Sequence, residues 1–208
     1  MAAAAQAFTV QEASYVVGRP RKAIDQAVDR GELPTSQKAK GRYLKLWDLR
    51  YLAAQALVGD QVTPLGRNKL YQAIRKSPLG QPQVRFGQLV FDMSGVDKAI
   101  VERVEKLTQL SAVVKGHGGQ TPVLKGSDAP VHLIASLARG QGVEATLEDY
   151  PGLSRGQVEA ALEYAKAYPK TGRPYPAVSL KRMISKVAES GVFDEETDAP
   201  SVSIDMFR

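Results

Sequence analysis

The chain has 208 residues, of which 43% are hydrophobic, 24% charged and 7% aromatic, and this composition is typical of a globular protein rather than a disordered one. The absence of cysteine excludes disulfides, thiol nucleophiles and cysteine-based metal sites. No apolar stretch approaches the roughly 18 residues of a membrane span, and the first residues lack the charges of a secretory signal. We therefore expect a cytoplasmic protein without a membrane partner.

Charge is distributed unevenly along the chain. The net charge is +6, but residues 1–110 carry 17 basic and 10 acidic side chains, whereas residues 189–208 carry one basic and six acidic ones. A basic body is typical of proteins that bind a polyanion such as DNA, because Lys and Arg replace condensed counterions on the phosphate backbone. The acidic tail indicates either a solubilising segment or a contact with a second partner that is basic or holds a metal.

The first elements predicted from the sequence are two short helices. Thr9 and Glu12 form the capping box of a helix that begins near Val10, and Gly18 supplies the left-handed residue that ends it. The second helix starts at Pro20 and closes at Gly31. Two short helices joined by a glycine-containing turn form a helix-turn-helix, whose second helix enters the major groove in DNA-binding proteins.

The second helix and the segment after it carry the predicted DNA contacts. Arg can pair with guanine and Gln with adenine, while Lys and Arg also contact phosphates. Residues 33–45 are predicted to form a hairpin wing with a basic tip, which suits a DNA backbone or a minor groove. The alternative for the helix is an ordinary solvated face. The predicted contacts are Arg19, Arg21, Lys22, Gln26 and Arg30 on the helix, and Lys38, Lys40 and Arg42 on the wing.

A helix that starts at Trp47 completes this unit, residues 8–58, and Trp47 is predicted to anchor its core. A shift of 46 residues superposes Arg21 on Arg67, which predicts a second, degenerate helix-wing unit over residues 61–110, with a hairpin that turns at Gly87. This unit either adds phosphate contacts or serves packing or dimerisation. The phosphate contacts predicted in it are Arg67 and Lys69.

The first unit contains four short sequence motifs. They are FTVQEA at 8–13, the helix with Arg21, GELP at 31–34, and Arg42-Tyr43 before Trp47-Asp48-Leu49. On these motifs, the region from Arg19 to Leu57, with the helix before it, resembles the winged helix-turn-helix of MerR-like and excisionase-like regulators. The resemblance implies a DNA-binding protein.

Three further short helices are predicted after a breaker-rich linker at residues 115–122: near 131–139, near 144–150, and after a capping box formed by Ser154 and Gln157. Three short helices with tight turns predict a homeodomain-like bundle. A phosphate-binding loop is not expected here, because Lys125-Gly126-Ser127 reverses the required Gly-Lys-Ser/Thr order.

The runs GQTPVLKG at 119–126, LEDYPGL at 147–153 and AALEYA at 160–165 are similar to the domain-of-unknown-function family number 433, found in VapB-type antitoxins. The resemblance spans residues 113–174, with Ser127-Asp128 where the family commonly has Thr-Arg. A winged domain in front of such a domain resembles the larger antitoxins of VapBC toxin-antitoxin pairs. This resemblance implies a PIN-domain ribonuclease toxin as the partner.

Residues 175–208 are predicted to form a short helix, 181–189, and an acidic tail whose residues 201–206 alternate polar and apolar as a half-buried strand does. Such a strand is expected to add to a sheet edge of the toxin, and the resemblance implies that Arg208 reaches the toxin's metal-binding carboxylates. The alternative is a frayed terminus. The predicted toxin contacts are Met183, Ile184, Val187, Phe193, Val202, Ile204, Met206, Phe207 and Arg208.

The sequence does not favour catalysis. His117 and His132 lack a nucleophile or carboxylate at a meaningful spacing, so each is predicted to be a surface or cap residue. The acids Asp92, Asp97, Glu102 and Glu105 are predicted to line a solvated helix face rather than a metal-dependent nuclease site. We therefore expect no catalytic residues, no metal and no cofactor.

The sequence as a whole predicts a mainly α fold with small β-hairpin wings. Winged helix-turn-helix units are followed by a homeodomain-like three-helix domain and an extended C-terminal tail. The expected function is that of an antitoxin that represses its own operon by binding operator DNA as a homodimer, associated with the nucleoid when bound, and that neutralises a PIN-like ribonuclease. The alternative is a stand-alone winged-helix transcriptional regulator, or an excisionase-like factor, without a toxin. A nucleic-acid-processing enzyme is the least favoured function.

Overall fold

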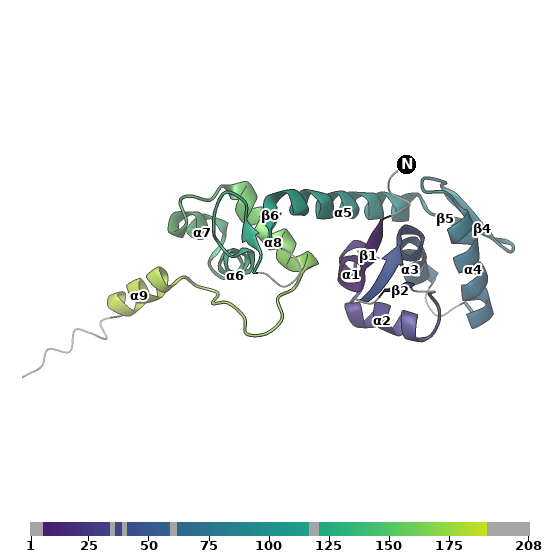
Figure 1. The fold of residues 1–208 in the computed structure, drawn as a ribbon, viewed down its shortest axis with the longest axis horizontal. Helices are drawn as coiled ribbons and strands as arrows, with labels where there is room; N and C mark the ends of the chain where they lie inside the picture. Colours follow the sequence, from purple (N-terminus) through teal and green to yellow (C-terminus); the bar gives the residue numbers. More distant parts are fainter. Residues whose placement is uncertain (1–5, 34–35, 39–40, 59–61, 117–120, 191–208) are drawn as a thin grey trace, which may run out of the picture.

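The computed structural model describes residues 6–33, 36–38, 41–58, 62–116 and 121–190. These residues form a mainly helical fold with small antiparallel sheets, as the sequence predicts. In chain order the elements are β1 (Ala7–Thr9), α1 (Val10–Val17), α2 (Arg21–Asp29), β2 (Ser36–Lys38), β3 (Gly41–Lys45), α3 (Leu46–Val58), α4 (Pro64–Lys76), β4 (Gln83–Phe86), β5 (Leu89–Asp92), α5 (Ser94–Val113), β6 (Val114–Lys115), β7 (Val123–Leu124), α6 (Val131–Gln141), α7 (Val143–Asp149), α8 (Arg155–Ala167) and α9 (Leu180–Glu189). Figure 1 shows α5 as a long helix between α1–α4 at one end and α6–α8 at the other, with α9 beyond them.

The turn between α1 and α2 has the predicted caps. Glu12 N donates to Thr9 Oγ1 at 3.2 Å and Thr9 N donates to Glu12 Oε2 at 2.8 Å, so the capping box is complete. Gly18 ends α1 with φ of 73°, a left-handed conformation that glycine adopts without strain. Pro20 lies just before the first residue of α2 as its N-cap.

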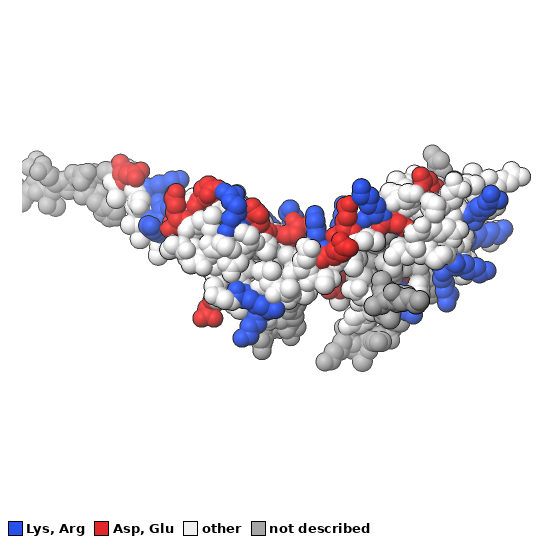
Figure 2. Space-filling view, turned by 90° about the horizontal axis from the view of Figure 1, so that it is seen from above, with Lys and Arg blue, Asp and Glu red and all other residues white. Residues whose placement is uncertain are grey.

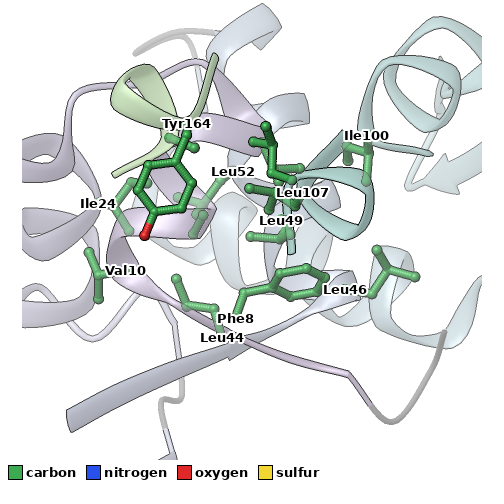
Figure 3. Packing of buried hydrophobic residues seen from close by; sticks show 14 of the residues in the cluster. Phe8, Val10, Ile24, Leu44, Leu46, Leu49, Leu52, Ile100, Leu107 and Tyr164 are labelled. Carbon is green, nitrogen blue, oxygen red and sulfur yellow. The ribbon is translucent and has the colours of Figure 1, made fainter. Parts of the chain in front are cut away.

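A three-stranded antiparallel sheet of order β1-β3-β2 packs beneath the first helices. Phe8 of β1 pairs with Leu44 of β3, and both side chains are buried. Figure 3 shows these side chains in one buried cluster with Leu49 and Leu52 of α3. Burying a side chain of this size stabilises the fold by about 1.5–3 kcal/mol, so this contact fixes the sheet against α3.

The segment after α3 has the predicted order of helix, hairpin and helix. Thr63 caps α4, Pro64 occupies its first turn, and the β4–β5 hairpin turns at Gly87, whose φ is 59°. The closing helix α5 extends to Val113, beyond the predicted end of this unit at residue 110, and leads directly into β6. Asp97 of this helix is buried, at 6% exposure, so the prediction that it lies on a solvated face is wrong.

The linker predicted at residues 115–122 is flanked by two short strands. β6 pairs with β7 in antiparallel register, with Val114 opposite Leu124, and both side chains are buried. Their burial explains why this Gly-rich stretch begins and ends in ordered strands. The three helices α6–α8 follow, and Ser154 and Gln157 form the predicted capping box at the start of α8.

Hydrogen bonds join α1 to α8 across a large separation in sequence. Tyr168 Oη donates to Glu12 Oε1 at 2.7 Å, and Gln11 Nε2 donates to the Ala167 carbonyl at 3.1 Å. Arg103 of α5 donates to the Val16 carbonyl at the end of α1 at 2.9 Å. The first helices and the α6–α8 helices are therefore packed together through α1, α5 and α8.

Candidate nucleic-acid and partner interfaces

The outer face of α2 carries four of the predicted DNA contacts. Ile24 and Ala27 are buried in the core, and the opposite side of the helix is exposed. Arg21 forms an ion pair with Asp25 one turn later, at 3.5 Å. The exposed predicted contacts on this helix and its end are Arg21, Lys22, Gln26 and Arg30.

Two other predicted contacts, Arg19 and Arg67, form hydrogen bonds within the molecule. Arg19 Nη1 donates to Gln55 Oε1 at 3.1 Å, and Gln55 Nε2 donates to Glu32 Oε2 at 2.7 Å. Arg67 Nη1 donates to Glu32 Oε1 at 2.9 Å. This network connects the start of α2 to α3 and α4, so both guanidinium groups hold these helices together. We therefore expect them to contribute less to a DNA-binding surface than the exposed residues of α2.

The β2–β3 hairpin contacts α2 through one arginine. Arg42 of β3 forms ion pairs with Asp29 at 2.8 Å and with Asp25 at 3.6 Å. The arginine thereby offsets both carboxylates on the outer face of α2. Lys38 belongs to β2, opposite Gly41 of β3, and Lys40 lies outside the described residues.

A groove opens between α4 and the β4–β5 hairpin, and we name it the α4–hairpin groove. Its volume is about 870 Å³. Figure 2 shows Lys and Arg side chains along this end of the molecule, at the right-hand edge. Of the individually predicted contacts Lys69 lines it, and Lys76 and Arg85 belong to the same predicted unit. The groove is lined by Asn68, Lys69, Gln72, Ala73, Lys76, Ser77, Gln81, Val84, Arg85, Phe86 and Gly87.

The helix α9 presents an apolar face that nothing in the described residues covers. The exposed fractions are 50% for Met183, 59% for Ile184 and 42% for Val187, the three predicted partner contacts on this helix. Leu180 is 71% exposed on the same helix and was missed by the sequence analysis. The remaining predicted partner contacts lie outside the described residues: Phe193, Val202, Ile204, Met206, Phe207 and Arg208.

A polar cluster, which we name the α9 clasp, anchors the start of this helix. Asp149 Oδ2 accepts hydrogen bonds from Ser179 Oγ at 2.6 Å, Gln141 Nε2 at 2.7 Å and Arg182 Nε at 3.2 Å. Ser179 N also donates to Gln141 Oε1 at 2.9 Å. The hydrogen bond from Ser179 is the main cause that lowers the pKa of Asp149, and those from Gln141 and Arg182 act in the same direction. The clasp therefore favours an ionised carboxylate.

The segment before α9 runs against α6. Ser136 Oγ donates to the Tyr175 carbonyl at 3.0 Å. Gly140 of α6 lies so close to Ala177 that a Cβ atom there would meet the Ala177 carbonyl oxygen at 2.0 Å. The lack of a side chain at residue 140 allows this approach. The position of α9 therefore depends on contacts along the whole approach as well as on the clasp.

The described residues contain no cluster of three metal-binding side chains, and no helix among them is long and apolar enough to cross a membrane. His132 packs edge-on against Tyr164, with ring centroids 5.7 Å apart, and burial lowers its pKa. It is partly buried in a packing role rather than at the surface. His117 lies outside the described residues.

Comparisons with known proteins bear on the C-terminal helices. A family model described as "Protein of unknown function (DUF433)" matches residues 114–165, which include β6, β7, α6, α7 and most of α8. The uncharacterized protein y4eO of Sinorhizobium fredii is 34% identical to the chain over 89 residues. The chain spans 40% of that protein's length, and 41% of the chain is aligned. No solved structure matches the chain.

Proposed function

We propose that the chain is an antitoxin that binds operator DNA with one end and a PIN-like ribonuclease toxin with the other. The observation that carries this proposal is the exposed apolar face of α9. A helix whose four large apolar side chains are 42–71% exposed, yet whose first turn is held by the α9 clasp, is suited to a partner that covers it. The neutralisation of a toxin requires no catalytic residue in the antitoxin, because blocking the toxin's active site is sufficient.

The proposed DNA surface is the outer face of α2 together with the β2–β3 hairpin, as in a winged helix-turn-helix. Lys22 and Arg30 are exposed, and Arg42 compensates the two carboxylates that would otherwise face the phosphates. Gln26 offers an amide that can pair with adenine in the major groove. We propose binding as a homodimer, because a two-fold related pair of such helices fits a palindromic operator.

The contacts between α1 and α8 support a single protein with two tasks. The hydrogen bonds of Gln11 and Glu12 to the end of α8 connect the proposed DNA-binding helices to the helices that hold the α9 clasp. Occupation of α9 by a toxin would therefore bring that toxin to the operator with the antitoxin. The second candidate, a regulator without a toxin, is favoured only if α9 instead pairs with a second copy of this chain.

The experiment is a co-purification of the chain with the products of the genes that flank its own, among which we expect a PIN-like ribonuclease. We expect Met183→Asp combined with Ile184→Asp to abolish the complex, because two charges would be buried in an apolar interface. The matched control is Ser185→Asp with Lys186→Gln, exposed neighbours on the same helix whose replacement makes the same change in net charge. Binding that survives the first variant would exclude α9 as the toxin contact. A dimer of the wild-type chain that is lost in the Met183→Asp, Ile184→Asp variant, seen by light scattering without a toxin, would show that α9 pairs with a second copy and would favour the regulator.

A further inference from the structure

We infer that the α4–hairpin groove is a second binding surface for double-stranded DNA, which holds the phosphates of one strand separately from α2. The proposed function assigns DNA to α2 and the β2–β3 hairpin and leaves this groove without a role. The side chains that line the groove belong to α4, β4 and the connections beside them, so the groove can bind DNA even if α2 has another task.

The lining of the groove is selective for an anion. Lys69 and Lys76 from α4 and Arg85 from β4 lie on it, together with side-chain amides and a hydroxyl. No carboxylate is among the lining residues. Within the described part of the chain these three cations form no ion pair, and all three are exposed. Their charges are therefore available to replace counterions on a phosphate backbone.

The charge around the groove exceeds that around α2. Residues 62–91 carry five basic and no acidic side chains, a net charge of +5, whereas residues 21–45, which cover α2 and the β2–β3 hairpin, carry seven basic and three acidic ones, a net charge of +4. Not all five cations reach the groove, because Arg67 is paired with Glu32 and the Arg75 guanidinium lies 6.0 Å from the Trp47 ring centroid. The three that remain are the groove residues, so we expect each of them to bind a phosphate.

The arrangement fits duplex DNA better than a single strand. Single-strand binding relies on exposed aromatic side chains on which bases stack. The large hydrophobic side chains exposed in the described residues are all aliphatic, and Phe86 in the groove packs against Phe91 with ring centroids 6.4 Å apart. The groove therefore lacks a stacking platform.

The amides that line the groove point to the major groove of B-form DNA. On α4 the amides of Asn68 and Gln72, one turn apart, lie on the groove beside Lys69. An amide can pair with adenine in the major groove of DNA, while the corresponding groove of A-form RNA is too narrow for side chains to read. We therefore assign duplex DNA and treat RNA as a test outcome.

The experiment measures the salt dependence of binding of the full chain to a random-sequence duplex DNA by fluorescence anisotropy. The groove variant is Lys69→Gln, Lys76→Gln and Arg85→Gln. The matched control is Lys98→Gln, Lys106→Gln and Arg139→Gln, which removes the same charge from exposed positions on α5 and α6. Because the groove variant removes three phosphate-binding cations, we expect the slope of log K against log salt to become less steep by about 2.7. The control should change the slope by less than half as much.

A third variant, Arg21→Gln with Lys22→Gln, separates this inference from the proposed function. A change in slope for the groove variant alone supports the groove and removes DNA from α2. A change for the α2 variant alone overturns the inference and leaves the proposed function intact. Equal slopes for groove variant and control also overturn it, provided that thermal unfolding shows both folded. Tighter binding of the wild-type chain to duplex RNA or single-stranded DNA of the same length, abolished in the groove variant, would overturn the assignment to duplex DNA.

Discussion

The guanidinium of Arg50 on α3 and the carboxylate of Asp97 on α5 form a two-point ion pair in the protein interior. Arg50 Nε lies 2.7 Å from Asp97 Oδ1 and Nη2 lies 3.0 Å from Oδ2, with side-chain exposures of 2% and 9%. Arg50 Nη1 also donates to the Ser77 carbonyl at 2.7 Å, and Gly80 N donates to Asp97 Oδ2 at 3.0 Å. The pair therefore joins α3 and α5 to the connection between α4 and β4, which supports the α4–hairpin groove.

Asp97→Ala is expected to lower the free energy of unfolding by about 3–5 kcal/mol, because the substitution leaves the Arg50 charge buried without a partner. Urea denaturation measures the change. The double variant Arg50→Met with Asp97→Leu is the control, and we expect it to lose far less stability, since it removes both charges together. A loss below about 1 kcal/mol for Asp97→Ala would mean that water reaches Arg50 and that the pair is not a structural centre.

The sequence predicts this fold best where the signal is local. The capping boxes at Thr9 and Ser154 and the hairpin turn at Gly87 each depend on a few neighbouring residues, and the structure has all three. Asp97 shows the limit. Charged side chains are usually exposed, so the sequence predicts a solvated position, and Arg50, which pairs with it in the interior, lies 47 positions away.

The predicted binding residues show the same limit. Arg19, Arg21 and Arg67 look alike in sequence, but the partners Gln55 and Glu32 turn two of them inward. Lys76 and Arg85 lie in the same predicted unit as Arg67, but nothing in the sequence favours them over Arg67. Whether a cation lines the groove or pairs with a neighbouring helix depends on how α4 packs against the hairpin, and this packing is seen only in the structure.

Gly140→Ala is expected to displace the segment before α9, because the new Cβ would lie 2.0 Å from the Ala177 carbonyl oxygen. Trypsin should then cleave at Lys181 or Arg182 faster than in the wild-type chain. Gly156→Ala on α8 is the matched control, since a Cβ there meets nothing within 4 Å. Alanine at that position should instead add about 0.5–1 kcal/mol of stability through helix propensity. Equal cleavage of the two variants would show that the approach of Ala177 to α6 does not hold α9.

The α9 clasp is expected to open in acid. The folded state lowers the pKa of Asp149, so its contribution is complete above the ordinary aspartate value of about 3.9 and is lost as the pH falls through the lowered pKa. Amide hydrogen exchange of α9, corrected for the intrinsic effect of pH, should therefore accelerate below about pH 4. In Asp149→Asn the exchange should be fast already at pH 7 and should show no acid transition. An acid transition retained in that variant would assign it to another carboxylate.

The ion pairs of Arg42 make a prediction about DNA affinity within the proposed function. Asp25 and Asp29 lie on the outer face of α2 and are offset by Arg42 at 3.6 and 2.8 Å. Asp25→Asn with Asp29→Asn should therefore strengthen DNA binding and steepen its salt dependence, because Arg42 becomes free to contact phosphate. Arg42→Gln should weaken binding by more than the removal of one cation alone, since two carboxylates would then face the backbone uncompensated. Fluorescence anisotropy measures both, with Glu102→Gln and Glu105→Gln on α5 as the control of equal charge change. If that control strengthens binding as much as the α2 variant does, the effect comes from net charge alone, and α2 is not the helix that faces DNA.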